Sequence, residues 1–214
     1  MKGAIFDLDG TLIDSMWFWE KLVDDYLLSV GIEPPEDLRD VLKELSLLEG
    51  CFYMKDRFNM AKTPEEINAE IEELLESYYA DKFLLKPYVL ETLEDFKSRK
   101  IKMCLATATE DKLVSKVFNR LRIGEYFDFI QTSNNTGIGK KDTRFFQLAI
   151  DRLSLNPEDI WVFEDALHCI VAAKKTGLNV VAIADNSALK DFDEIKKYAD
   201  ICIDDFSQLD IDNL

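Results

Sequence analysis

The stretch that decides the fold is GAIFDLDGT, at residues 3–11. Its first four residues form a short apolar run, which is typical of a buried strand. Two carboxylates, Asp7 and Asp9, come directly after this run, and a turn at Gly10 follows. Residues two apart in a regular strand point to the same side, so the sequence predicts two acidic side chains next to each other where the strand ends.

Two adjacent carboxylates are costly to ionise together unless a cation or a shared proton relieves their repulsion. An Asp-Gly turn alone would favour an ordinary strand end. The complete pattern, with Asp7, Asp9, Gly10 and Thr11 after an apolar run, instead favours a metal site. In such a site one carboxylate attacks phosphorus and the other handles a proton.

Further apolar runs are brief and lack strict alternation, which is typical of parallel strands covered on both faces. They lie at residues 101–106, 127–131, 160–163, 180–184 and, more weakly, 201–203. Helical stripes lie between the later runs, at residues 113–121, 145–153 and 166–176. Strands that alternate with helices predict an α/β core with a Rossmann-like parallel sheet.

Residues 15–86 follow a different pattern, with several helical stripes and no convincing strand. One helix start is clear, because Thr63 and Glu66 have the spacing of a capping box. We therefore expect an all-helical domain at residues 15–86, inserted into an α/β core made of residues 1–14 and 87–214.

The composition excludes several classes of protein. The net charge of −16 predicts a surface that repels nucleic acids and anionic membranes, so an anionic substrate needs local positive charge from a metal or from lysines. The four cysteines form no CxxC pair, which argues against a zinc or redox site. No apolar stretch approaches the ~20 residues that span a bilayer, and an early strand leaves no room for a signal peptide. We expect a cytoplasmic enzyme.

Polar residues follow the later predicted strands. Thr107 closes the second strand, and its hydroxyl can hold a phosphate oxygen together with the amides from Ala108 onward. Without the other motifs, Thr107 would be interpreted as a helix N-cap. Lys140 lies in a glycine-rich loop, where a buried lysine can screen aspartate and phosphate; alone, it would be a surface lysine. Glu164 and Asp165 end the fourth strand. Open α/β sheets bind ligands along the edge where these residues meet.

On these motifs the chain resembles the haloacid dehalogenase-like superfamily, in its β-phosphoglucomutase-like phosphatase branch. The order and spacing of the motifs match that family over nearly the whole chain. The helical insertion resembles the C1 cap of the family. The resemblance implies a phosphoric monoester hydrolase that depends on Mg²⁺ and hydrolyses a small phosphate monoester, a sugar phosphate or related metabolite, through a phosphoaspartyl intermediate. It also implies a monomer.

The resemblance assigns roles to individual residues. Asp7 would be the nucleophile and Asp9 the general acid and base. Mg²⁺ would be held by Asp7, by the main-chain carbonyl of Asp9 and by Asp165, with Glu164 behind these ligands. The transferring phosphoryl group would be bound by Thr107, the amide of Ala108 and Lys140.

The chain departs from the family pattern at several positions without losing a catalytic group. Lys141 and Thr143 stand where prolines are usual, and Tyr88 stands where glycine is usual. Ala166 and Cys169 replace a serine and a glycine after the acidic pair.

The sequence disfavours three alternative functions. A sugar phosphomutase of this branch carries a histidine on the first cap helix and a valine in the first motif, whereas this chain has Trp19 and Thr11. Its lone histidine, His168, is expected to be structural or exposed. A dehalogenase lacks a second aspartate, so Asp9 argues against that activity. A receiver-like signalling module also uses acidic residues, a threonine and a lysine, but it is much shorter and has no helical insertion.

Overall fold

The computed structural model describes residues 1–42, 45 and 47–214. The chain divides into two compact units, of which the first combines Met1–Trp17 with Ala80–Leu214 and the second is Phe18–Tyr79. The second unit lies within the segment that the sequence predicts as a helical insertion.

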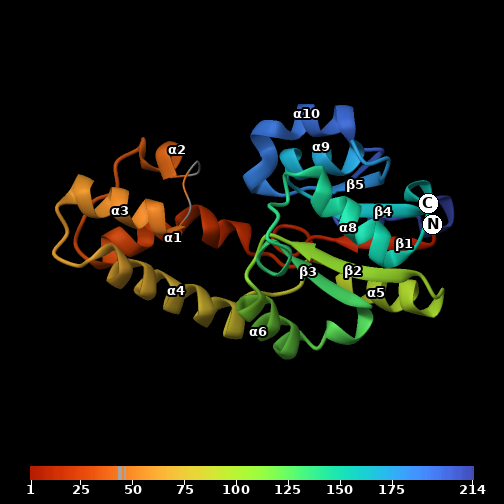
Figure 1. The fold of residues 1–214 in the computed structure, drawn as a ribbon, viewed down its shortest axis with the longest axis horizontal. Coiled ribbons are helices and arrows are strands. Elements are labelled where there is room, and N and C mark those ends of the chain that lie inside the picture. Colours follow the sequence, from red (N-terminus) through yellow and green to blue (C-terminus); the bar gives the residue numbers. More distant parts are fainter. Residues whose placement is uncertain (43–44, 46) are drawn as a thin grey trace. The chain divides into compact units, whose positions relative to one another are not determined.

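The first unit is built on a six-stranded sheet, in which every strand pair is parallel and the order is β3-β2-β1-β4-β5-β6 (Figure 1). The strands are β1 (Gly3–Phe6), β2 (Lys102–Thr107), β3 (Phe129–Thr132), β4 (Ile160–Glu164), β5 (Asn179–Ile183) and β6 (Ile201–Ile203). The predicted α/β fold with a parallel sheet is confirmed. Each predicted apolar run coincides with one strand, with its ends shifted by no more than two residues.

The strand order places β1 at the centre of the sheet. The chain first builds outward on one side through β2 and β3, and then crosses to the other side of β1 to form β4, β5 and β6. Open α/β sheets bind ligands at the carboxyl ends of the strands where the order reverses in this way. The ends of β1 and β4, which pair Phe6 with Phe163, are therefore the expected place for a site.

Helices cover both faces of this sheet (Figure 1). Ile5 and Val162 belong to a core cluster with residues of α8 and α9, whereas the next residues along the strands, Phe6 and Phe163, contact Phe96 of α5. The α-helices are α5 (Val89–Ser98), α6 (Asp111–Leu121), α7 (Ser133–Thr136), α8 (Thr143–Leu153), α9 (Leu167–Lys174) and α10 (Phe192–Tyr198). The 3₁₀ helices are η1 (Gly124–Tyr126), η2 (Pro157–Asp159), η3 (Asn186–Asp191), η4 (Phe206–Gln208) and η5 (Ile211–Asn213). The predicted helical stripes thus correspond to α6, α8 and α9.

The second unit is formed from helices, and none of its described residues lies in a strand. They are α1 (Met16–Ser29), α2 (Leu38–Leu42), α3 (Leu47–Phe58) and α4 (Pro64–Asp81). The predicted capping box begins α4, because the Glu66 N–H donates to Thr63 Oγ1 at 3.2 Å and the Thr63 N–H donates to Glu66 Oε2 at 2.7 Å. The buried face of α4 consists of Pro64, Ile67, Ile71, Leu75 and Tyr79.

Among the helices that the structure describes, none combines the length and the apolar character needed to cross a bilayer.

The aromatic layer on one face of the sheet generates a stability prediction. Phe163 is fully buried, and its ring stacks on Phe6 with centroids 4.6 Å apart. Replacing Phe163 by alanine removes this contact and leaves a cavity, so we expect the free energy of unfolding to fall by about 3–5 kcal/mol. Urea denaturation measures the loss.

The matched control is Leu189→Ala, since Leu189 is 63% exposed. This change should alter the free energy of unfolding by no more than about 0.5 kcal/mol. Equal effects of the two substitutions would contradict the assignment of Phe163 to the core.

Candidate active site

Asp7 follows β1 directly and extends the hydrogen bonding of the sheet by one residue. Its N–H donates to the carbonyl of Phe163 on β4 at 3.0 Å. This bond fixes the main chain at Asp7, so the carboxylate stands at the carboxyl edge of the sheet. The residue is buried.

Two further carboxylates come from the neighbouring strand. Glu164 is the last residue of β4, and Asp165 follows it. One carboxylate oxygen from each of Asp7, Glu164 and Asp165 lies within 4.8 Å of the others, and all three residues are buried. We call these three residues the acidic cluster.

Lys140 is the cation that balances part of this charge. It lies in the loop before α8 and is 5% exposed. Its Nζ donates to Asp7 Oδ1 and lies 2.9 Å from Glu164 Oε1. The structure therefore brings the predicted lysine into contact with the acidic cluster, although they are far apart in the sequence.

Main-chain amides hold the other oxygen of Glu164. Glu164 Oε2 accepts hydrogen bonds from the N–H groups of Asp165 at 2.6 Å and Ala166 at 3.2 Å. With these donors and Lys140, Glu164 is an anchored anion.

The charges of the site are strongly coupled. Burial raises the pKa of Asp7 to about 8, against the lowering effect of Lys140 and with a further rise from Glu164. Burial and then the charges of Glu164 and Asp7 raise the pKa of Asp165 well above its ordinary range. Burial would also raise the pKa of Glu164, but Lys140 and the donors around it lower it overall. Burial opposes the charge of Lys140, yet Asp7 and Glu164 outweigh it and raise the pKa of the lysine.

The pKa shifts of these four residues follow from the sum of their charges. Three carboxylates and one ammonium carry two net negative charges when all are ionised. The site becomes neutral when it takes up either two protons or one divalent cation. Carboxylate oxygens are the ligands that Mg²⁺ and Ca²⁺ prefer, so the donor set fits a hard divalent ion.

The backbone at Gly10 leaves little room beside the acidic cluster. Gly10 has a φ of 82°, and a Cβ at this position would lie 2.3 Å from Asp165 Oδ2. Glycine is thus required both for the left-handed conformation and for the close approach of the main chain to Asp165.

The carboxylate of Asp9 lies outside the acidic cluster. Its Oδ1 accepts from Ser15 Oγ at 2.6 Å, and its Oδ2 accepts from Thr109 Oγ1 at 2.5 Å. The predicted arrangement on one side of a strand does not apply, because β1 ends at Phe6 and both aspartates lie in the loop beyond it. Each oxygen of Asp9 instead accepts a hydroxyl hydrogen bond.

The residues predicted to bind phosphate lie at the same edge of the sheet. Thr107 is the last residue of β2 and is buried, and its Oγ1 accepts from the Thr109 N–H at 3.1 Å. Ala108 is exposed in the turn before α6. His168 is exposed on α9, as expected from the sequence.

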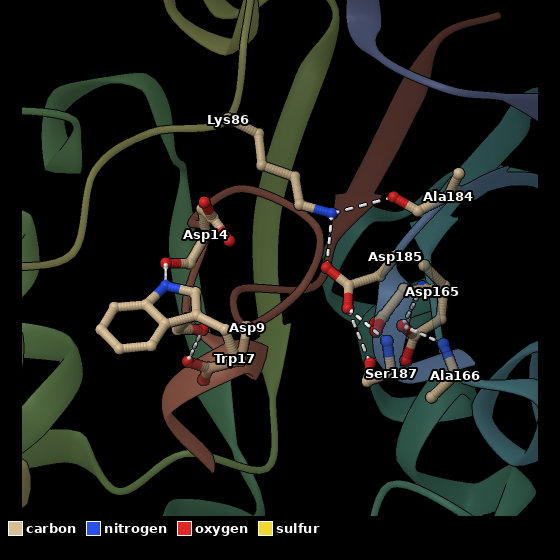
Figure 2. A network of polar contacts seen from close by, with 11 residues as sticks. Asp9, Asp14, Trp17, Lys86, Asp165, Ala166, Ala184, Asp185 and Ser187 are labelled. Carbon is tan, nitrogen blue, oxygen red and sulfur yellow. Dashed lines mark hydrogen bonds and ion pairs between the residues drawn. The ribbon is translucent and has the colours of Figure 1, made fainter. Parts of the chain in front are cut away.

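Sequence reasoning missed Ser15 and Thr109. Thr109 carried a signal, because a second hydroxyl two residues after Thr107 follows the same strand end. Ser15 carried none. Nearby, the indole Nε1 of Trp17 donates to the carbonyl of Asp14 at 3.1 Å (Figure 2).

Comparison with known proteins gives consistent matches. The sequence matches the family described as haloacid dehalogenase-like hydrolase over residues 4–183. A phosphorylated carbohydrates phosphatase from Thermotoga maritima is 29% identical over 178 residues, which cover 83% of this chain and 82% of the relative. Phosphoglycolate phosphatase 1 from Pseudomonas aeruginosa is 26% identical over 188 residues, which cover 84% of this chain and 68% of that relative. A crystal structure from Thermotoga maritima, described provisionally as a β-phosphoglucomutase, has a TM-score of 0.79 and 26% identity and covers 95% of this chain and 94% of that chain.

The contact between Gly10 and Asp165 generates a prediction about metal binding. In Gly10→Ala the new methyl group displaces the Asp165 carboxylate, so calorimetric titration with Mg²⁺ should show binding at least ~10-fold weaker. Gly137→Ala is the matched control, because Gly137 also has a positive φ, of 66°, but nothing lies within 4 Å of its added Cβ. The positive φ alone should cost each variant about 1–2 kcal/mol of stability, and the collision with Asp165 should add to this cost in Gly10→Ala. Equal Mg²⁺ affinity in both variants would contradict the arrangement.

The raised pKa values predict that metal binding releases protons. Below about pH 8 Asp7 holds a proton, and a cation must displace it. At pH 7 we expect about one to two protons to be released per Mg²⁺ ion, measured by calorimetry in buffers with different heats of ionisation. Binding without proton release at that pH would show that the carboxylates are already ionised.

The same shift predicts how stability depends on pH. The pKa of Asp7 rises from the ordinary value of 3.8 to about 8 in the folded protein. Between these values the unfolded chain holds fewer protons, so Asp7 contributes a loss of stability as the pH rises from about 4 to 8. Asp7→Asn should weaken this slope in urea denaturation without metal.

Proposed function

Because this chain belongs to the haloacid dehalogenase-like hydrolase family and is a hydrolase of phosphate esters, we propose that it is a Mg²⁺-dependent phosphatase with a phosphoaspartyl intermediate on Asp7. The family resemblance predicted from its motifs is confirmed. We propose a sugar phosphate or related small metabolite as the substrate, since the relatives are named as phosphatases of phosphorylated carbohydrates and of phosphoglycolate. The proposal includes a monomer in the cytoplasm, with the helical unit Phe18–Tyr79 as a C1 cap.

The observation that carries the proposal is the contact of Lys140 with Asp7 inside the acidic cluster. A structural salt bridge would need one carboxylate, whereas this lysine pairs with two, and the carboxylate of Asp165 lies within 4.8 Å of both. The surplus negative charge favours a site that works with a divalent cation. Phosphoryl transfer needs such charge neutralisation and positioning more than covalent chemistry.

The proposed metal ligands are the carboxylates of Asp7 and Asp165 and the main-chain carbonyl of Asp9. Glu164 is placed behind them, because Lys140 and main-chain amides already occupy its oxygens. When bound, the ion would keep Asp7 ionised and neutralise charge on the phosphoryl oxygens.

Asp7 is the proposed nucleophile. A carboxylate oxygen of Asp7 attacks phosphorus, and the bond from phosphorus to the alcohol oxygen breaks. Asp9 gives its proton to that oxygen, so the product leaves as an alcohol. In the second step Asp9 takes a proton from water, and the water oxygen displaces Asp7 from phosphorus to release inorganic phosphate.

The hydroxyl groups of Ser15 and Thr109 support the role of Asp9. They engage both carboxylate oxygens and leave the side chain little freedom to rotate. Thr107, the amide of Ala108 and Lys140 are the proposed contacts of the transferring phosphoryl group. Thr107 and Ala108 lie just before α6, and amides before a helix are suited to hold phosphate oxygens.

A mutase is the second candidate, favoured by the likeness to the structure described provisionally as a β-phosphoglucomutase. Against it, Trp19 occupies the place of the mutase histidine. Its indole Nε1 donates to the hydroxyl of Tyr79 at 3.3 Å within the helical unit. An indole N–H cannot accept or release protons as a histidine does.

The proposal predicts phosphate release in the presence of Mg²⁺ from a panel of sugar phosphates, nucleotides and small organic phosphates. Asp7→Asn should lower kcat roughly 10³-fold or more, because it removes the nucleophile and keeps the shape of the side chain. Excess EDTA should stop the reaction, and added Mg²⁺ should restore it. Release of inorganic phosphate measures both effects.

Asp14→Asn is the matched control, since Asp14 is an exposed aspartate on the same loop. It should retain the turnover of the natural protein. Turnover by Asp7→Asn at the rate of this control would exclude the covalent mechanism. Conversion of β-glucose 1-phosphate without phosphate release would favour the mutase instead.

A further inference from the structure

An ion pair with little exposed surface connects residues 84–86 to the segment that follows β5. Lys86 Nζ donates to Asp185 Oδ2 at 2.8 Å and to the carbonyl of Ala184 at 3.0 Å (Figure 2). The side chains of Lys86 and Asp185 are 10% and 8% exposed. The pair therefore lies in a largely water-excluded place, although neither residue belongs to the catalytic motifs.

The other oxygen of Asp185 is also engaged. Asp185 Oδ1 accepts from the N–H of Ser187 at 3.0 Å and from its Oγ at 2.7 Å, which caps η3 (Figure 2). Burial raises the pKa of Asp185, but Lys86 and Ser187 outweigh it and lower the pKa overall. The carboxylate is thus an ionised anchor, fixed to the loop that follows β5.

Residues 84–86 are hydrogen-bonded to residues 12–14. The N–H of Lys86 donates to the carbonyl of Leu12, and the N–H of Asp14 donates to the carbonyl of Leu84, each at 2.9 Å. Ile13 forms the antiparallel bridge between the two segments. The position of Lys86 therefore determines the position of residues 12–14.

The same residues close the loop that carries Asp9. The N–H of Ile13 donates to the carbonyl of Leu8 at 2.9 Å, and the carbonyl of Ile13 accepts from the N–H of Gly10 at 3.0 Å. A continuous path of hydrogen bonds thus runs from Asp185 through Lys86 to the main chain on both sides of Asp9. Figure 2 shows Lys86 and Asp9 in this part of the first unit.

A buried ion pair contributes little net stability, because desolvation of both charges offsets their attraction. Well-packed apolar side chains could serve the stability of this region equally well. Three further hydrogen bonds fix this ion pair, one to the carbonyl of Ala184 and two from Ser187. The pair therefore gives the chain a defined position, and the segment that it positions is the loop of Asp9.

We infer that Lys86 and Asp185 are positioning residues of the reaction, whose ion pair holds the Asp9 loop in register with the carboxyl edge of the sheet. The inference rests on the proposed function, in which Asp9 moves protons. A misplacement of about 1 Å far from the reacting atoms can cost roughly 100-fold in rate. The proposed phosphate contacts come from other segments, because Thr107 ends β2 and Lys140 lies in the loop before α8, so both should keep their positions.

The test compares Lys86→Met, Asp185→Asn and the double variant. Each should lower kcat by roughly 10- to 100-fold while KM changes by less than about 3-fold, because positioning of the acid is lost and phosphate binding is kept. Lys86→Arg, which retains the charge and the donors, should recover most of kcat. Phosphate release is measured at a temperature where circular dichroism shows every variant folded.

The single variants leave one buried charge unpaired, so their thermal midpoints should fall by roughly 6–20 °C. The double variant leaves no unpaired charge, and it carries the test if a single variant does not fold. Lys174→Met is the control for loss of a lysine ion pair away from the site, because Lys174 pairs with Asp200 at 2.7 Å just before the amino end of β6, with side chains 28% and 38% exposed. This control should keep the kcat of the natural protein.

Hydrogen exchange gives a second readout. The amides of Asp14 and Lys86 should exchange at least ~10-fold faster in the double variant, and at the natural rate in the Lys174→Met control. A double variant with natural kcat would overturn the inference, as would a change in KM alone. Failure of the natural protein to release phosphate from any substrate would instead count against the proposed function, and unchanged exchange rates in the double variant would still refute the positioning role.

Discussion

The packing of three carboxylates against a single lysine is the constraint on which this site depends. Asp7, Glu164 and Asp165 are all buried, and ionising all three is costly when Lys140 pairs with only Asp7 and Glu164. The folded chain can meet this constraint by binding protons or by binding a divalent ion. Since both solutions use the same carboxylates, proton binding, metal binding and stability are linked in this protein.

The sheet explains how the chain tolerates such a cluster. β1 and β4 are central and adjacent, and buried aromatic and aliphatic side chains cover both faces up to Phe6 on β1 and Phe163 on β4. The carboxylates begin where these apolar residues end. The main-chain N–H groups of Asp165 and Ala166 then donate to Glu164, so no additional side chain is needed to hold this oxygen. The apolar core and the charged site are therefore successive residues of the same strands.

Much of this was predictable from the sequence because it depends on local patterns. Short apolar runs predicted the strands, and the capping box at Thr63 predicted the start of α4. The motifs also identified Asp7 and Lys140. The orientation of Asp9 is not predictable in this way, because the prediction requires a regular strand through Asp9, whereas β1 ends at Phe6.

Contacts between distant segments were beyond sequence patterns for a physical reason. Thr109 meets Asp9 across 100 residues, and Lys86 meets Asp185 across 99. Both contacts depend on the register of neighbouring strands and on the exact path of loops, and neither segment has a periodicity that reports them. A lysine before a proline has no feature that separates a buried anchor from a solvated surface residue.

The net charge of −16 also limits how this protein can attract a phosphate ester. Lys140 is already paired with Asp7 and Glu164, and Lys86 is paired with Asp185, so neither of these lysines offers an uncompensated charge. In the proposed reaction, net attraction must therefore come mainly from the divalent cation and from main-chain amides before α6, while Lys140 adds a directed hydrogen bond to the phosphoryl group. Phosphate affinity should then depend on occupancy of the acidic cluster, which makes metal binding a condition for substrate binding as well as for chemistry.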